Sequence, residues 1–370
     1  MYKSHVMLSL LIVMLAAGCL LFYTSGCTSK NNSKPFTIHK GTNISHWLSQ
    51  SERRGEERRA FFGEADVKFI ADQGFDHLRI PIDEEQMWDE QGNKEAEAFA
   101  LLDSALNWCE KHGLKAIVDL HILRSHHFNY GDKPLWTDPA AQEHFLDFWR
   151  DLSAHLQNRP TDMVAYEPMN EPVADDPEQW NVLLEKAIKV IREKEPTRTL
   201  VIGSNRWQSV DTFDQLRIPE NDRNILLSFH SYTPLIFTHY KASWTKVGEY
   251  TGPIQYPGVI IKEEDLKGLP EDLVKEIGYY NGEYNRDVLV KLLEKPLAVA
   301  AKYNLPLYCG EWGCLPTVPE AGRMQWYADM RAILEQNNIA WATWDYKGNF
   351  GIISMDGQEV YQNLVDVLLK

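Results

Sequence analysis

The stretch Met163-Val-Ala-Tyr-Glu-Pro-Met-Asn-Glu-Pro172 is an apolar run that ends on a carboxylate, Glu171. A second run, Leu305-Pro-Leu-Tyr-Cys-Gly-Glu-Trp-Gly313, has the same form and carries Glu311. Ionised carboxylates are costly to bury unless they are paired or hydrogen-bonded, so strands that end this way usually open into a functional cleft. The two glutamates are far apart in the chain, so only a fold that gathers distant strand ends at one rim brings them together.

Short apolar runs of this kind alternate with helical patterns along the chain. We expect strands at residues 41–45, 75–81, 114–121, 164–170, 199–203, 225–230, 305–311 and 339–345. Periodic apolar positions predict helices at 64–73, 95–112, 138–157, 177–195, 286–303, 320–336 and 358–369, with a weaker one at 210–216. This alternation favours an α/β fold, a single (β/α)8 TIM barrel over residues 39–370. A doubly wound open sheet is the alternative, but the first strand lacks the Gly-rich turn of a nucleotide-binding version.

Residues 233–285 interrupt this alternation after the sixth predicted strand. The segment is too long for an ordinary strand-to-helix loop and is rich in Tyr and Trp. Loops of this length are usually functional or form small subdomains. We interpret it as an inserted subdomain over the catalytic rim, and the alternative is an aromatic excursion without ligand contact.

Composition excludes several classes of partner. The chain has 370 residues, 44% of them hydrophobic, and a formal net charge of -15. Nucleic acid and anionic membrane surfaces are therefore poor partners. After Cys27 only Cys109, Cys309 and Cys314 remain, without a histidine spacing suited to zinc. Cys309 and Cys314 flank Glu311 and allow a redox interpretation, but small buried packing residues are favoured.

The N-terminal segment is typical of a targeting signal. Lys3 precedes an uncharged, almost wholly apolar stretch, and Thr24-Ser-Gly-Cys27 resembles a bacterial lipoprotein signal. We expect residues 1–26 to be a signal peptide, residues 27–38 to be a tether, and the protein to be exported to the cell envelope with a lipid at Cys27. Cys19 is a rival lipidation site. An uncleaved membrane anchor and soluble export are the alternatives.

Polar and aromatic side chains stand at the predicted strand ends, where a (β/α)8 barrel has its active site. Two carboxyl groups that flank a bond suit glycoside hydrolysis, in which one donates a proton and the other attacks or activates water. Arg79 and Tyr232 are suited to keep Glu311 ionised. Each of these residues alone has a packing explanation, whereas the whole set favours a site. Its members are Arg79, His121, Asn170, Glu171, His230, Tyr232, Glu311 and Trp344.

As an ordered set, these residues resemble glycoside hydrolase family 5, the cellulase family of retaining (β/α)8 glycosidases. The resemblance runs from about residue 41 to residue 369. Its motifs are Leu78-Arg-Ile-Pro81, Asp119-Leu-His121, Asn170-Glu-Pro172, Phe229-His-Ser-Tyr232, Cys309-Gly-Glu-Trp-Gly313 and Trp341-Ala-Thr-Trp-Asp345. The residues that follow Phe229 are similar to the clostridial endoglucanase C type, which carries a helical insertion after strand six.

The resemblance implies retaining hydrolysis with Glu171 as acid/base and Glu311 as nucleophile. It implies no cofactor or metal. It also implies an enzyme that cleaves internal bonds of a β-linked polysaccharide, with β-1,4-glucan favoured. We expect the protein to be a monomer. Mannan, xyloglucan or β-1,3-glucan, exo-acting or transglycosylating activity, and non-catalytic glycan binding are the alternatives. The implied sugar-binding residues are Arg79, His121, Asn170, His230, Tyr232 and Trp344. Outer aromatic platforms are expected at Trp47, Trp136, Trp207 and Trp244.

Overall fold

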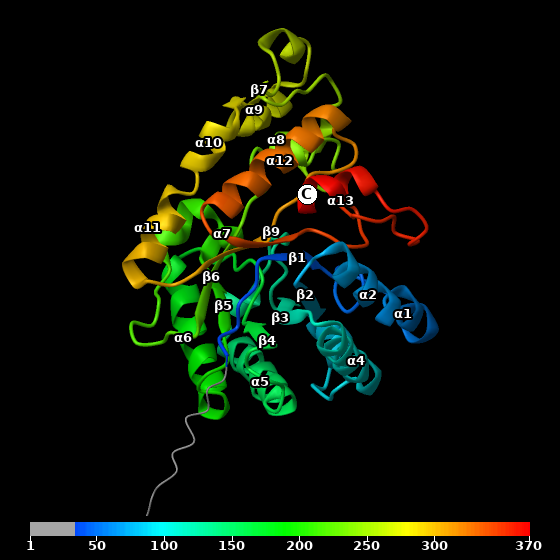
Figure 1. The fold of residues 1–370 in the computed structure, drawn as a ribbon. Helices are drawn as coiled ribbons and strands as arrows, with labels where there is room; N and C mark the ends of the chain where they lie inside the picture. Colours follow the sequence, from blue (N-terminus) through cyan, green and yellow to red (C-terminus); the bar gives the residue numbers. More distant parts are fainter. Residues whose placement is uncertain (1–33) are drawn as a thin grey trace, which may run out of the picture. The chain divides into compact units, whose positions relative to one another are not determined.

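Eight parallel strands close into a barrel (Figure 1). Around the barrel they follow the order β1-β10-β9-β6-β5-β4-β3-β2, so the predicted (β/α)8 barrel is confirmed and the open sheet is excluded. The strands are β1 (Lys40–Asn43), β2 (His77–Asp83), β3 (Lys115–Ile122), β4 (Val164–Glu167), β5 (Leu200–Gly203), β6 (Ile225–His230), β9 (Leu307–Glu311) and β10 (Ala340–Thr343).

This computed structural model describes residues 34–370, which form one compact unit. The expected signal peptide, Cys27 and most of the expected tether lie outside the described residues. Within residues 34–370, no helix combines the length and the apolar character needed to cross a bilayer. Ile38, which we expect in the tether, is buried and packs against the apolar layer of the barrel interior.

Helices follow the strands and cover the outside of the barrel (Figure 1). Three of the four longest begin at a carboxylate that accepts from free backbone N–H groups, as where Asp138 accepts from Ala140 N at 2.8 Å. The helices outside the segment between β6 and β9 are α1 (Gly55–Phe61), α2 (Glu64–Gln73), α3 (Glu84–Met87), α4 (Ala96–His112), α5 (Pro139–Leu156), α6 (Pro177–Lys194), α7 (Asn205–Gln208), α12 (Glu320–Gln336) and α13 (Gln362–Leu369). The weak helix expected at 210–216 is a 3₁₀ turn, η2 (Val210–Gln215).

The long segment between β6 and β9 contains short elements that belong to the same compact unit as the barrel. Its antiparallel strands β7 (Gly258–Val259) and β8 (Glu283–Tyr284) pair with each other. The helix expected at 286–303 is divided in two near Leu292. The helices and turns are α8 (Leu235–Thr238), η3 (Lys246–Glu249), η4 (Glu263–Leu266), α9 (Glu271–Tyr280), α10 (Arg286–Lys291) and α11 (Glu294–Tyr303).

Strand β4 is shorter than predicted. It ends at Glu167, whereas we expect it to continue to Asn170. Pro168 follows Glu167 and has no N–H to donate to a strand ladder, which explains the early end. Asn170 and Glu171 therefore stand on the loop that follows the strand.

An apolar layer fills the barrel interior. Because strand side chains alternate between faces, six of the eight strands each place one residue in this layer. It is formed by Ile117, Ala165, Val201, Leu226, Tyr308 and Ala342, with Ile38 packed against them. The residues two positions further along β2, β3 and β4 also point into the barrel. Their side chains lie above the apolar layer and form the base of the functional site.

We predict that Gly41→Ala destabilises the barrel. An added Cβ at Gly41 would overlap the His77 ring, which is buried and held by Asp76 Oδ1 at 2.7 Å and by Tyr308 OH at 3.1 Å. Overpacking of this kind lowers the free energy of unfolding by about 1–3 kcal/mol. Urea unfolding followed by circular dichroism measures it. The control is Gly131→Ala, whose Cβ meets nothing within 4 Å, and equal stability of the two variants would contradict the prediction.

Candidate active site

A buried polar layer lies directly above the apolar layer of the barrel. Arg79, Asp119 and Glu167 stand two residues beyond His77, Ile117 and Ala165 on β2, β3 and β4, so strand alternation turns them inward. All three side chains are fully buried. Charges this deep persist only when they are paired and hydrogen-bonded.

Arg79 is the centre of this layer. Its guanidinium presents a rigid fork of donors that suits several carboxylates at once. Burial opposes the charge, but the neighbouring carboxylates raise the pKa of Arg79 well above its usual value, so the side chain stays a cation. Its partners are Glu167 Oε2 at 2.7 Å, Glu311 Oε1 at 2.7 Å, Asn170 Oδ1 at 2.8 Å, Asn43 Oδ1 at 2.9 Å and Asp119 Oδ2 at 3.0 Å.

Glu311, the last residue of β9, lies between a cation and a phenol. Its Oε1 accepts from Arg79, and its Oε2 accepts from Tyr232 OH at 3.0 Å. Burial raises the pKa of Glu311, and the Arg79 charge acts against that rise. These two donors favour the ionised form of this carboxyl group.

Glu171 has a different environment. Its Oε1 lies 2.8 Å from His230 Nδ1. Burial raises the pKa of Glu171 well above its usual value, and the negative charge of Glu311 raises it further. Burial also holds the pKa of His230 well below its usual value, so a neutral imidazole faces Glu171. Glu171 therefore keeps its proton more readily than Glu311.

The two carboxyl groups are close enough to act on one bond. One oxygen of Glu171, one oxygen of Glu311 and a nitrogen of His230 lie within 4.8 Å of one another. This trio has the ligand types and spacing that would also suit a metal ion. This upper limit on the separation of the two carboxyl oxygens is compatible with the roughly 5 Å of retaining glycosidases and lies below the roughly 6.5–9.5 Å of inverting ones.

His121 and Trp344 form another wall of the site. Their rings stack with centroids 5.4 Å apart and planes inclined by 8°. His121 Nδ1 lies 2.7 Å from Asp119 Oδ2, and burial lowers the pKa of His121 to about 3, so the ring is neutral near neutral pH. Gln50, on the loop after β1, reaches His121 Nε2 at 3.4 Å.

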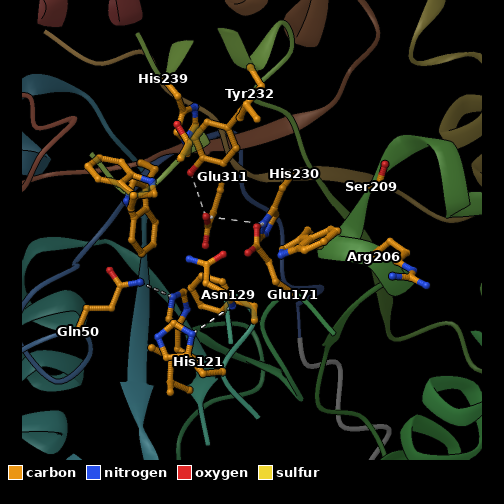
Figure 2. A pocket seen from close by; sticks show the side chains of 18 of the residues that line it. Gln50, His121, Asn129, Glu171, Arg206, Ser209, His230, Tyr232, His239 and Glu311 are labelled. Atoms are coloured by element: carbon orange, nitrogen blue, oxygen red, sulfur yellow. Dashed lines mark hydrogen bonds and ion pairs between the residues drawn. The ribbon is translucent and has the colours of Figure 1, made fainter. Parts of the chain in front are cut away.

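These residues border an open cleft of about 1180 Å³ (Figure 2). Glu171, Glu311, His230 and Tyr232 point toward one another at its floor, and Gln50 and His121 lie across from Arg206 and Ser209. Loops that follow β1, β2, β3, β4, β5, β6 and β10 contribute to the lining. The cleft is large enough for several sugar units.

The structure corrects four of the expected sugar contacts. Trp47 has no exposed surface, packs on Phe62 and donates to Arg58 O at 2.9 Å, so it is a core residue. Trp136 is also buried, and both lie outside the set of described residues that line the cleft. Arg79 and Asn170 are fully buried beneath the carboxylates, so they position groups and do not line the cleft.

The other expected residues do line the cleft: His121, His230, Tyr232, Trp344, Trp207 and Trp244. Cys109, Cys309 and Cys314 are buried free thiols. Burial raises the pKa of the Cys314 thiol, which agrees with a packing role.

Our reading of the sequence missed Glu167, Asp119 and Gln208. Gln208 Nε2 donates to Glu167 Oε1 at 3.0 Å, and its Oε1 accepts from Glu171 N at 3.3 Å, so it ties the polar layer to the Glu171 loop. Asp119 stands two residues before His121, and that spacing alone indicates a shared face. Nothing local in the sequence marks Gln208.

Strained backbone also concentrates at the cleft. Non-glycine residues with positive φ include Glu171 (42°), His46 (56°), Gln50 (50°), Arg206 (58°) and Trp207 (61°), and all five line it. Such conformations cost of order 1–3 kcal/mol each and cluster at functional sites. Surrounding contacts must therefore hold these loops in place.

Residues 34–350 match the cellulase family, glycosyl hydrolase family 5. The chain belongs to this family. Endoglucanase C of Acetivibrio thermocellus is 33% identical in an alignment of 338 residues that covers 89% of this chain and 97% of the relative. Cellodextrinase A of Ruminococcus flavefaciens is 30% identical over 307 residues, 82% of this chain and 84% of the relative.

Solved structures agree on the fold of this family 5 glycoside hydrolase. Endoglucanase Cel5A of the hyperthermophilic Thermotoga maritima has a TM-score of 0.72 at 24% identity, covering 90% of this chain and 96% of that one. The predicted membership of family 5 is confirmed, and relatives of the endoglucanase C type are among those that the chain matches.

We predict that Asp83 makes the family 5 barrel less stable as pH rises. Burial raises the pKa of Asp83 to about 7, against about 3.9 in an unfolded chain, although Gln50 N donates to its Oδ2 at 2.6 Å. Between these values the folded state binds more protons than the unfolded state. This group therefore lowers the free energy of unfolding by up to about 1.4 kcal/mol per pH unit.

Asp83→Asn removes that titration. Melting temperatures measured from pH 4 to pH 8 should fall less steeply for this variant than for the wild type. Asp132→Asn, at an exposed position of the same cleft, is the control. An unchanged pH dependence in Asp83→Asn would show that Asp83 is already ionised in the folded protein.

Proposed function

We propose that the protein is a retaining endo-β-glucanase that hydrolyses internal β-1,4 bonds by double displacement. The observation that carries the proposal is the pair of carboxyl groups whose oxygens lie within 4.8 Å in opposite electrostatic settings. Glu311 contacts a buried cation, and Glu171 contacts a neutral imidazole. A nucleophile must be ionised and a general acid must be protonated, so this division assigns one role to each.

In the first step, a Glu311 oxygen attacks the anomeric carbon and forms an ester bond to the sugar. The bond from that carbon to the glycosidic oxygen breaks, and the oxygen takes the proton of Glu171 as the leaving sugar departs. Arg79 and Tyr232 hold the attacking carboxylate in position. Asn170, held by Arg79, precedes Glu171 on the same loop and helps to fix its position.

In the second step, Glu171 is a carboxylate and acts as a general base. It takes a proton from a water molecule, whose oxygen attacks the anomeric carbon and releases Glu311. Two inversions give net retention of configuration. His230 Nδ1 lies 2.8 Å from Glu171 Oε1 and 3.7 Å from Glu311 Oε2, so its neutral ring orients Glu171 and lies close to Glu311.

Two observations support a β-glucan as the substrate. The relatives described above are an endoglucanase and a cellodextrinase. The cleft is open and has exposed aromatic rings at its rim, which suits a chain that extends beyond the cleaved bond. Trp344 stacks on His121 in the lining of the same cleft and offers an aromatic face for a sugar.

We predict that Glu171→Ala and Glu311→Ala each lower kcat/KM on a soluble β-glucan by about 10²–10⁴-fold or more, because each removes a group that acts in the transition state. Azide then distinguishes their roles on an activated aryl β-cellobioside. Azide in Glu311→Ala should yield the α-glycosyl azide, and in Glu171→Ala it should yield the β-glycosyl azide. Proton NMR identifies the anomer.

Glu264→Ala, at an exposed position of η4, is the matched control and should keep full activity. Melting temperatures establish that the variants are folded. The same anomer from both variants would contradict the assignment of roles, and an active Glu311→Ala variant without azide would remove Glu311 from catalysis.

We also propose that the protein is a cell-envelope lipoprotein with its lipid at Cys27, on the sequence pattern of residues 1–27. Expression of the full chain in a bacterial host with radiolabelled palmitate should label the wild type and Cys19→Ala but not Cys27→Ala. A label that is lost in Cys19→Ala would move the lipid to that residue. An unlabelled wild type would refute lipidation.

A further inference from the structure

Two buried polar atoms beside the carboxyl pair have no hydrogen-bond partner among the residues that the structure describes. They are His230 Nε2 and Ser228 Oγ. Nearly all buried polar atoms in proteins are paired, and an unpaired buried hydroxyl destabilises a fold in a way that an alanine methyl group does not. A serine at such a position therefore points to a partner that its hydroxyl serves.

Strand alternation places these two groups one above the other. Ser228 and His230 are two residues apart on β6, so both side chains point into the barrel. Leu226, two residues earlier, lies in the apolar layer. Ser228 therefore belongs to the buried polar layer, and His230 stands above it in the lining of the cleft. The hydroxyl thus lies on the buried side of the imidazole ring.

A bulge in the neighbouring strand brings the two unpaired atoms to the same place. The register between β6 and β9 shifts just before His230, which pairs with Glu311, so Gly310 is the extra residue of the bulge. A Cβ on Gly310 would lie 2.9 Å from Ser228 Oγ and 3.1 Å from His230 Nε2. Because glycine has no Cβ, the hydroxyl and the ring nitrogen can meet there directly or through one bridging water molecule.

His230 contacts Glu171 with its other ring nitrogen. Nδ1 lies 2.8 Å from Glu171 Oε1 (Figure 2), and burial keeps the pKa of His230 well below its usual value, so the ring is neutral. A neutral imidazole has one N–H and one bare nitrogen, and the partner of one nitrogen decides the state of the other. A hydroxyl that donates to Nε2 leaves the proton on Nδ1, which then donates to Glu171.

This tautomer suits both steps of the proposed reaction. In the first step Glu171 Oε1 accepts from Nδ1–H, so the acid proton is on Oε2 and can pass to the glycosidic oxygen. In the second step the same N–H stabilises the Glu171 carboxylate that acts as base. The other tautomer would turn a bare Nδ1 toward Glu171. That nitrogen would hold the acid proton in the first step and repel the carboxylate in the second.

We propose that Ser228 is a positioning residue that fixes the tautomer of His230 by donating to Nε2, directly or through one water molecule. It thereby keeps the proton of Glu171 available to the leaving group. The proposal rests on the function proposed above, because it takes Glu171 as the acid. Ser228 lies outside the set of described residues that line the cleft, so its loss should slow proton transfer without removing a contact to substrate.

Substrates that differ in their need for an acid test this role. Cellohexaose has a sugar as leaving group, which must take a proton, whereas 2,4-dinitrophenyl β-cellobioside releases a phenolate that is stable without one. For Ser228→Ala, the ratio of kcat/KM on cellohexaose to kcat/KM on the aryl substrate should fall about tenfold, the size of one net hydrogen bond. Ser228→Thr keeps the hydroxyl and should restore most of the ratio.

Nitrogen-15 NMR of the full-length protein with labelled histidine reads the tautomer without any substrate. The bare and the protonated nitrogen of a neutral imidazole have well-separated chemical shifts, and the signals that are missing in His230→Gln identify His230. The wild type should have its proton on Nδ1. Ser228→Ala should add a population with the proton on Nε2.

Ser153→Ala is the matched control, because it removes a buried hydroxyl that donates to Glu195 Oε1 at 2.8 Å away from the cleft lining. It should lower the melting temperature but leave the ratio and the His230 signals unchanged.

An unchanged ratio in a folded Ser228→Ala variant would overturn the proposal, and so would a wild-type His230 that is protonated at Nε2. The wild-type spectrum decides the tautomer without the variant. A wild type that hydrolyses no β-glucan would overturn the proposed function instead.

Discussion

The buried guanidinium of Arg79 is the interaction on which the site depends. One cation, itself without solvent access, meets carboxylates from β3, β4 and β9. Removing one partner of such a group leaves an uncompensated buried charge, which costs about 3–5 kcal/mol. Because the partners come from strands distant in sequence, the network forms only when the barrel closes, and closure therefore assembles the site and its electrostatics together.

The same network makes two identical side chains chemically different. Glu311 ends β9 within reach of Arg79, whereas Glu171 stands on a strained loop beyond β4 and faces a neutral His230. The carboxylates that surround Arg79 outnumber its single charge, so the cluster as a whole favours retaining a proton. Burial raises the pKa of Glu171 well above its usual value, and the Arg79 cation opposes the rise at Glu311. The proton is therefore held where a leaving group needs it.

The sequence predicted this arrangement where local chemistry and strand periodicity agree. Glu171, Glu311, His230, Tyr232 and Trp344 meet at one cleft because each stands at or just beyond a strand end. The prediction was wrong where packing decides the position of a side chain. Trp47 and Trp136 are of the residue type that forms sugar-binding platforms, but they lie in the core. Pro168 ends β4 earlier than predicted. The sequence did not indicate Gln208, because its role depends on a strained turn that brings its side chain to Glu167. Burial and long-range pairing are properties of the closed barrel and cannot be read from one strand.

The central claim is that Glu311 attacks the sugar while Glu171 holds the proton. Trapping the covalent intermediate with an activated 2-deoxy-2-fluoro-β-cellobioside tests it most directly, because the fluorine slows release of the sugar more than its attachment. Mass spectrometry of the digested protein should find one fluorosugar, on Glu311 within residues 305–313. A label on Glu171 or another residue would contradict the account, as would turnover of the parent cellobioside with inversion and no label.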